Sequence, residues 1–145
     1  MNKIFKIISA GILGLLLTTG VFAKTEVVYI PKNTGNPYFD SIIKGFEVGA
    51  EKYGYNFSTV APATADATSQ LPFIKAEIQR GVDVIAISPN SNDALNTVFD
   101  QARKKGIIIM VVNGDIPGSE AHRDLAIMPV DFSTVGTAQM TLMGQ

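Results

Sequence analysis

Polar side chains of a few types gather where short apolar runs of the sequence end. Asparagine and aspartate dominate this set, with one lysine and two adjacent aromatic residues: Lys32, Asn33, Tyr38, Phe39, Asn90, Asn113, Asp115 and Asp131. Amide and carboxylate groups offer donors and acceptors that match neighbouring hydroxyls, and an aromatic ring covers the apolar C–H face of a sugar. This mixture predicts the binding of a neutral polyol.

Catalytic chemistry has little support in the same sequence. The chain has no cysteine, and its one histidine, His122, lies in the polar stretch PGSEAHRD, where a surface position is expected. No nucleophile with a base is evident, and no GxGxxG or GxxxxGK[ST] motif follows the first apolar run, which disfavours a flavodoxin-like or Rossmann-like enzyme. We therefore expect no enzyme activity, no cofactor and no metal.

Each candidate residue also has a structural explanation that the sequence leaves open. The stretch Asn33-Thr34-Gly35-Asn36-Pro37 is typical of a turn, and so is Asn113-Gly114-Asp115. Asn90 and Asp131 lie where helix caps are expected. Either of the two aromatic residues can belong to the core instead of the site.

The elements that must bring these side chains together follow from the spacing of apolar residues. Short β-branched runs alternate with longer amphipathic segments, the pattern of βαβ units. The expected strands are 26–30, 55–60, 82–88, 106–112 and 125–129, and the expected helices begin near 38, 71, 93 and 133. We predict an α/β fold with a doubly wound parallel sheet and helices on both faces, in which ligands bind outside the carboxyl ends of the strands.

Length and charge limit the number of domains and the classes of partner that can be expected. The chain has 145 residues, of which 46% are hydrophobic, so it is long enough for one domain with a substantial core. The formal net charge is −1, with 12 basic and 13 acidic residues. A nucleic-acid partner is not expected, because phosphate binding needs a concentrated basic face.

The first 23 residues have the composition of a secretory signal peptide. Lys3 and Lys6 precede an apolar stretch that ends in Val21-Phe22-Ala23. The alternative, a membrane anchor, is disfavoured because this stretch is short and is interrupted by serine, glycine and threonine. We expect cleavage after Ala23 and a mature chain in the periplasm.

Two long stretches resemble a known family. NPYFDSIIKGFEVGAEKYGY resembles the first helix of ribose-type periplasmic sugar-binding proteins, the substrate-binding components of ABC importers. IKAEIQRGVDVIAISPNSNDALNTVFDQARKKGIIIMVVNGDIP resembles the stretch that follows in those proteins. The resemblance covers nearly all of residues 24–145 and implies a fold of two lobes that close over a sugar, of which 24–145 would be the first.

The resemblance also implies roles for individual residues. Tyr38 and Phe39 match the aromatic residues that stack on the sugar ring, and Asn113 stands where many members have an aspartate. Asp115 and Lys32 match ligand contacts of the branch that binds rhamnose or a furanosyl autoinducer. This chain differs from the ribose-binding members, which have Asp-Arg where it has Asn-Gly-Asp.

The implied function is capture of a monosaccharide or similar polyol in the periplasm, for delivery to an ABC permease in the inner membrane. The implied state is a monomer. A periplasmic receptor domain of the same fold, which senses a sugar or autoinducer for a signalling partner, remains the alternative.

Overall fold

The computed structural model describes residues 23–144 except 92, 116–117 and 129–131. It contains one sheet of five strands in the order β2-β1-β3-β4-β5, and every neighbouring pair is parallel. The strands are β1 (Glu26–Ile30), β2 (Asn56–Thr59), β3 (Val84–Ile87), β4 (Ile108–Val112) and β5 (Leu125–Ile127). The predicted signal peptide lies outside the described residues, apart from its last position.

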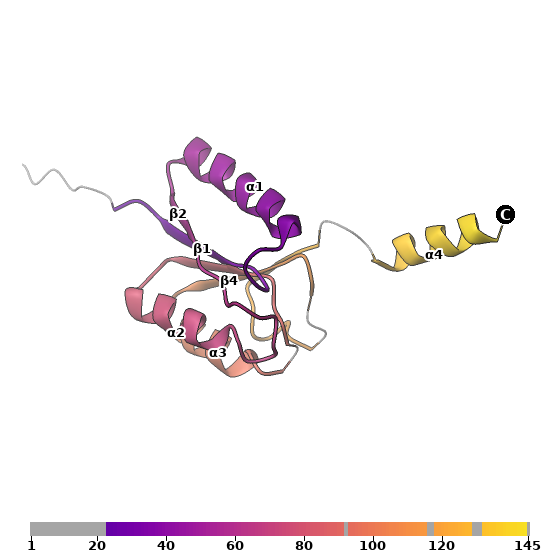
Figure 1. Cartoon of the computed structure of the whole chain (residues 1–145). Helices are drawn as coiled ribbons and strands as arrows, with labels where there is room; N and C mark the ends of the chain where they lie inside the picture. The colour runs from indigo at the N-terminus through magenta and orange to yellow at the C-terminus, as the bar shows by residue number, and fades with distance from the viewer. Residues whose placement is uncertain (1–22, 92, 116–117, 129–131, 145) are drawn as a thin grey trace, which may run out of the picture.

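Helices cover both faces of this sheet (Figure 1). Helix α1 (Pro37–Tyr53) lies on one face, and α2 (Leu71–Arg80) and α3 (Asn96–Lys104) lie on the other. Right-handed crossovers produce this arrangement, because the chain leaves β1 toward one edge of the sheet and leaves β3 toward the other. The predicted doubly wound α/β fold is therefore confirmed.

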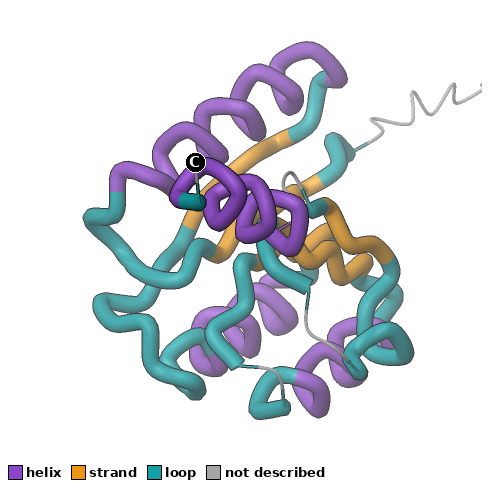
Figure 2. Tube along the Cα trace, turned by 90° about the vertical axis from the view of Figure 1, so that its right-hand side faces the viewer, coloured by secondary structure: helices purple, strands orange, loops and turns teal. Residues whose placement is uncertain are grey.

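The last helix, α4 (Phe132–Met143), stands apart from the sheet in Figure 1, and Figure 2 shows the same chain from the side. It has no acidic residue in its first turn and no basic residue in its last. Within 23–144, apart from the gaps given above, no helix combines the length and apolarity needed to cross a membrane.

The start of α1 is determined by local sequence. Asn36 has an extended backbone conformation, and its side-chain Oδ1 accepts a hydrogen bond of 3.1 Å from the backbone N–H of Tyr38. Pro37 follows in the first turn, where a missing N–H costs nothing. Gly54 ends the helix with φ of 73°, in the left-handed region that glycine tolerates. These signals fix α1 directly after the polar loop.

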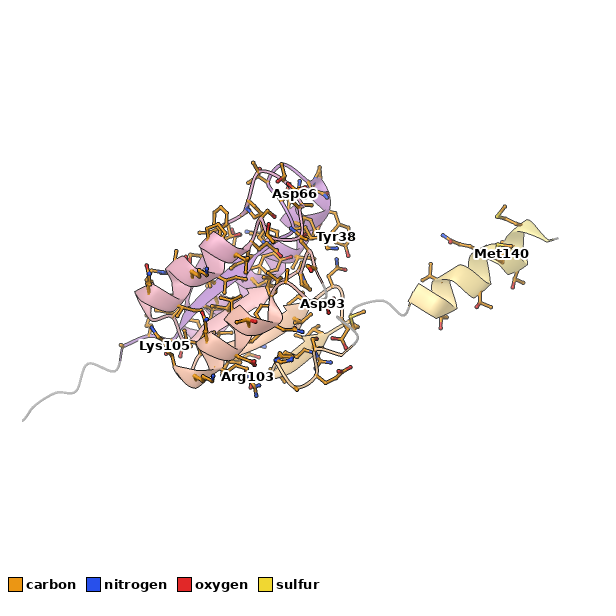
Figure 3. All side chains as sticks on the ribbon, turned by 90° about the horizontal axis from the view of Figure 1, so that it is seen from below. Tyr38, Asp66, Asp93, Arg103, Lys105 and Met140 are labelled. Carbon is orange, nitrogen blue, oxygen red and sulfur yellow. The ribbon has the colours of Figure 1, made fainter. Side chains whose placement is uncertain are left out.

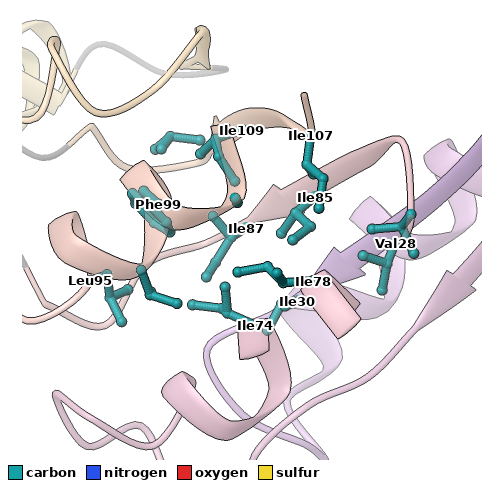
Figure 4. Packing of buried hydrophobic residues seen from close by; sticks show 14 residues of the cluster. Val28, Ile30, Ile74, Ile78, Ile85, Ile87, Leu95, Phe99, Ile107 and Ile109 are labelled. Carbon is teal, nitrogen blue, oxygen red and sulfur yellow. The ribbon is translucent and has the colours of Figure 1, made fainter. Parts of the chain in front are cut away.

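Alternation along the strands sends apolar side chains to both faces. Val28 and Ile30 contribute to a cluster with residues of α2 and α3, shown in Figure 4. Tyr29, between them, points to the opposite face and packs with Phe39 of α1. Because both faces are covered in this way, β1 and β3 are central strands with largely buried side chains, and their apolar runs are typical of that position.

Helix α3 begins later than the sequence predicts. The prediction placed its start near Asp93, whereas the structure starts it at Asn96. The hydroxyl of Ser91 accepts hydrogen bonds from the backbone N–H groups of Asp93 and Ala94, at 3.3 and 3.1 Å. Ser91 therefore stabilises a separate turn ahead of the helix rather than capping the helix itself.

Candidate ligand-binding site

The candidate site lies where the strand order reverses. The chain runs from β1 to β2 on one side and from β3 to β4 on the other, so the loops after β1 and β3 diverge at the carboxyl edge of the sheet. A crevice at such a point is the usual ligand position in open α/β sheets. Figure 3 shows Tyr38 at this end of the molecule and Lys105 at the opposite end.

A buried glutamine joins the two diverging loops. Gln70 is fully buried, and its Nε2 donates to the carbonyl oxygens of Pro31 at 3.0 Å and Ser88 at 2.8 Å. Its Oε1 accepts from the backbone N–H of Asn90 at 2.9 Å. Sequence reasoning missed Gln70, because no spacing rule connects it to the strand ends. The buried Gln70 side chain thus fixes the two loops to one another.

Asn90 adds a second connection between the same loops. Its Nδ2 donates to the carbonyl oxygen of Lys32 at 2.9 Å and to the hydroxyl of Ser69 at 3.1 Å. Its buried Oδ1 has no hydrogen-bond partner among the described residues. Nearby, the Nδ2 of Asn33 donates to the carbonyl of Thr34 at 2.9 Å, within the turn after β1. Both asparagines therefore help to shape the loops that border the site.

Tyr38 and Asn113 meet at the site although 75 positions separate them. The hydroxyl of Tyr38 donates to Oδ1 of Asn113, directly after β4. The Tyr38 side chain is half exposed. Asn113 has φ of 65°, a left-handed conformation that asparagine tolerates better than most residues. The structure brings these two predicted site residues together.

Phe39 takes the core position that the sequence left open for one of the two aromatic residues. It is 5% exposed and packs against Tyr29 and Val112 beneath α1. Its ring makes an edge contact with the Tyr38 ring, with centroids 5.3 Å apart and planes at 87°. Phe39 therefore supports Tyr38 from below, and a direct contact with a ligand stays a prediction.

Asp115 forms an ion pair that the sequence did not predict. Nε of Arg123 donates to Oδ1 of Asp115 at 2.9 Å, and Nη2 donates to Oδ2 at 2.7 Å. Arg123 was missed because it precedes β5, whereas ligand residues are expected after strands. Asp131, the last predicted site residue, lies outside the described residues.

A chain of hydrogen bonds joins β1 to β4 through Ser88, the residue that follows β3. The hydroxyl of Tyr29 lies 2.8 Å from that of Ser88, which donates to the carbonyl oxygen of Val112 at 3.0 Å. Burial raises the pKa of Tyr29 to about 12, an effect that the hydrogen bond with Ser88 opposes in part and the nearby Tyr38 reinforces. The neutral phenol is therefore the form that folding favours.

We expect this phenol to make the protein less stable in alkali. An unfolded tyrosine has a pKa of about 10. Because the folded pKa is higher, stability is fully present below pH 10 and falls between about pH 10 and 12, by at most about 1.4 kcal/mol per pH unit. Urea denaturation across this range should show that Tyr29→Phe removes this part of the decline. A wild-type slope equal to that of the variant would contradict the assignment.

Two hollows formed by the described residues adjoin α1, and the smaller has polar side chains in its walls. A hollow of about 240 Å³ lies between the loop after β1, the start of α1 and the residues after β2, and Asn33 and Phe39 line it. A groove of about 520 Å³ on the same face of the sheet is lined mainly by apolar side chains of α1 and the strands. A polyol needs several polar contacts, so the larger groove does not suit it.

Comparison with known proteins identifies the family. The family model described as "Periplasmic binding protein domain" matches residues 27–145. This chain belongs to the periplasmic binding protein family. This membership confirms the family resemblance that the sequence indicates, and it confirms the expectation of a binding protein rather than an enzyme. No group of three His, Cys, Asp or Glu side chains that could hold a metal occurs among the described residues.

Two relatives of this periplasmic binding protein illustrate the match. The D-allose-binding periplasmic protein of Escherichia coli is 32% identical over 111 residues, which cover 76% of this chain and 36% of that protein. A solute-binding protein of an ABC transporter from Clostridium phytofermentas, solved with L-rhamnose, is 26% identical with a TM-score of 0.77. The match covers 83% of this chain and 37% of that one. The chain thus spans little more than a third of each relative.

Proposed function

We propose that this chain is the first lobe of the substrate-binding component of an ABC importer, which captures a monosaccharide or similar small polyol in the periplasm. The observation that carries the proposal is the meeting of Tyr38 and Asn113 at the carboxyl edge, beside the point where the strand order reverses. The D-allose-binding relative and the structure solved with L-rhamnose support a sugar ligand.

In this proposal, different candidate residues contact different parts of the sugar. The half-exposed ring of Tyr38 covers the C–H face of the sugar, and Asn113 and Asp115 bond its hydroxyls. Lys32, Asn33, Asn90 and Asp131 are the further candidate contacts that the sequence predicts. Phe39 holds Tyr38 in place from the core.

A second lobe completes the site in this proposal. The chain spans 36% of the length of the D-allose-binding relative, which leaves room in such a protein for a second wall. Closure of the two walls removes water from the sugar and strengthens its hydrogen bonds. The complete protein then presents the sugar to a permease in the inner membrane and acts as a monomer, after export with cleavage behind Ala23.

Tyr38→Ala tests the proposed sugar contact. In the two-lobed protein of this proposal, we expect the variant to bind sugar about 1–3 kcal/mol more weakly, because it loses the ring that covers the C–H face. The measurement is a thermal-shift screen with D-allose, D-ribose and L-rhamnose, followed by calorimetry with the sugars that raise the melting temperature.

Tyr53→Ala is the matched control. Tyr53 is exposed and is the last residue of the same helix, just ahead of the start of β2 and away from the carboxyl ends of the strands. Its replacement should therefore leave affinity unchanged. Equal weakening by both variants would show that the effect is not local to the site. Failure of the wild-type protein to bind any of a wider set of pentoses, hexoses, deoxyhexoses and autoinducer would contradict the proposed function.

A further inference from the structure

The ion pair between Asp115 and Arg123 is bidentate. Each of two nitrogens of the Arg123 guanidinium donates to a different carboxylate oxygen, at 2.9 and 2.7 Å. The Arg123 side chain is 15% exposed, and that of Asp115 is 32% exposed. Paired bonds of this kind fix the plane of a carboxylate as well as its distance. Asp115 therefore has a defined orientation in this structure.

The two partners come from opposite ends of the connection between β4 and β5. Asp115 follows the carboxyl end of β4 by three positions, whereas Arg123 lies two positions ahead of β5. The arginine side chain thus joins the end of this connection to its beginning. Asp115 comes two positions after Asn113 in the chain, and Oδ1 of Asn113 accepts a hydrogen bond from the Tyr38 hydroxyl.

Partly exposed ion pairs add little to the stability of a protein. The main effect of this pair is therefore on the orientation of the Asp115 carboxylate. A side chain that is already fixed loses less rotational freedom when a ligand arrives. The guanidinium also offsets the negative charge of Asp115, so a ligand without charge meets carboxylate oxygens whose charge is balanced nearby.

We infer that Arg123 is a positioning residue of the ligand site, which orients the Asp115 carboxylate toward the hydroxyls of an uncharged sugar. The inference rests on the proposed function, and it adds a residue that neither the sequence patterns nor the position after a strand indicates. Arg123 acts through Asp115, so its removal has an effect only while Asp115 is present as a carboxylate.

A double-mutant cycle in the complete protein tests this dependence. The variants are Asp115→Asn, Arg123→Gln and the double variant, and calorimetry measures binding of D-allose, D-ribose and L-rhamnose. We expect Asp115→Asn to weaken binding about ten- to a hundredfold, because charge-assisted hydrogen bonds are lost. Arg123→Gln should weaken it about three- to tenfold, and the double variant should bind as weakly as Asp115→Asn alone.

Two further variants separate positioning from a general effect on the fold. Arg103→Gln removes an ion pair between α3 and the same connection, in which Nε of Arg103 donates to Oδ1 of Asp124 at 3.0 Å, and it should leave affinity unchanged. Arg123→Lys keeps the positive charge but cannot form the bidentate pair, so its affinity should lie between those of the wild type and Arg123→Gln. It also serves as the test variant if Arg123→Gln does not fold.

Each outcome decides between the alternatives. Unchanged affinity in the Arg123 variants would overturn the inference and leave the proposed function standing. Equal weakening by Arg123→Gln with and without the Asp115 carboxylate would overturn it as well, because a merely structural arginine affects both backgrounds. If the wild-type protein binds none of the three sugars, the screen of the wider set decides the proposed function, and binding of no member overturns both.

Discussion

Replacement of Phe39 by alanine should lower the free energy of unfolding by about 3–5 kcal/mol, the range for large aromatic side chains removed from a core. Phe39 is 5% exposed and packs between α1 and the sheet, against Tyr29 and Val112. The cavity left by its ring cannot collapse easily, because the helix start is fixed by Asn36 and Pro37. Urea denaturation of residues 24–145 measures the loss.

Tyr38→Ala is the control, since the two rings are adjacent in sequence but only Phe39 is buried. We expect the control to lose less than about 1 kcal/mol, as is usual for exposed positions. If Phe39→Ala proves too unstable to measure, Phe39→Leu retains most of the volume and should show a smaller loss. A loss for Phe39→Ala no greater than for Tyr38→Ala would show that Phe39 is not part of the core.

The second large effect concerns the chain without a second lobe. We expect residues 24–145 alone to give no measurable saturable binding of D-allose, D-ribose or L-rhamnose in calorimetry. Small-molecule sites bury most of the surface of their ligands. On a single open wall, water competes for Asp115 and Asn113, and closure cannot remove it.

The comparison needs proof that the isolated chain is folded, which a cooperative urea transition provides. The complete protein, measured in parallel, should bind at least one sugar. Tight saturable binding of any monosaccharide by residues 24–145 would mean that one wall suffices, and the mechanism of closure would have to be abandoned.

Most of the fold could be predicted from the sequence because its signals are local. The apolar run at 26–30 became β1 without change, and α1 lies within one residue of its predicted start, since Asn36, Pro37 and Gly54 act on their own neighbours. The predicted start of α3 was wrong, because a serine such as Ser91 can accept the same hydrogen bonds in a turn as in a helix cap. Such choices depend on the path of the chain beyond the local segment.

The candidate site was predictable only as a set of residue types at one edge. Topology alone brings strand ends together in a parallel sheet, so Tyr38, Asn113 and Asp115 were expected to be neighbours. The direction of each side chain was not determined, because adjacent aromatic residues at a helix start point in different directions. The structure buries Phe39 and exposes Tyr38.

Hydrophobic periodicity and end signals act over a few residues, so the order of strands and helices, the covered faces and the end of the sheet that carries the site all follow from the sequence. The contacts by which Gln70 joins the loops after β1 and β3, and by which Arg123 holds Asp115, are visible only in the folded chain. Those contacts require long side chains from separate elements to reach the same point. No local pattern records such a meeting, since it depends on how the whole chain folds.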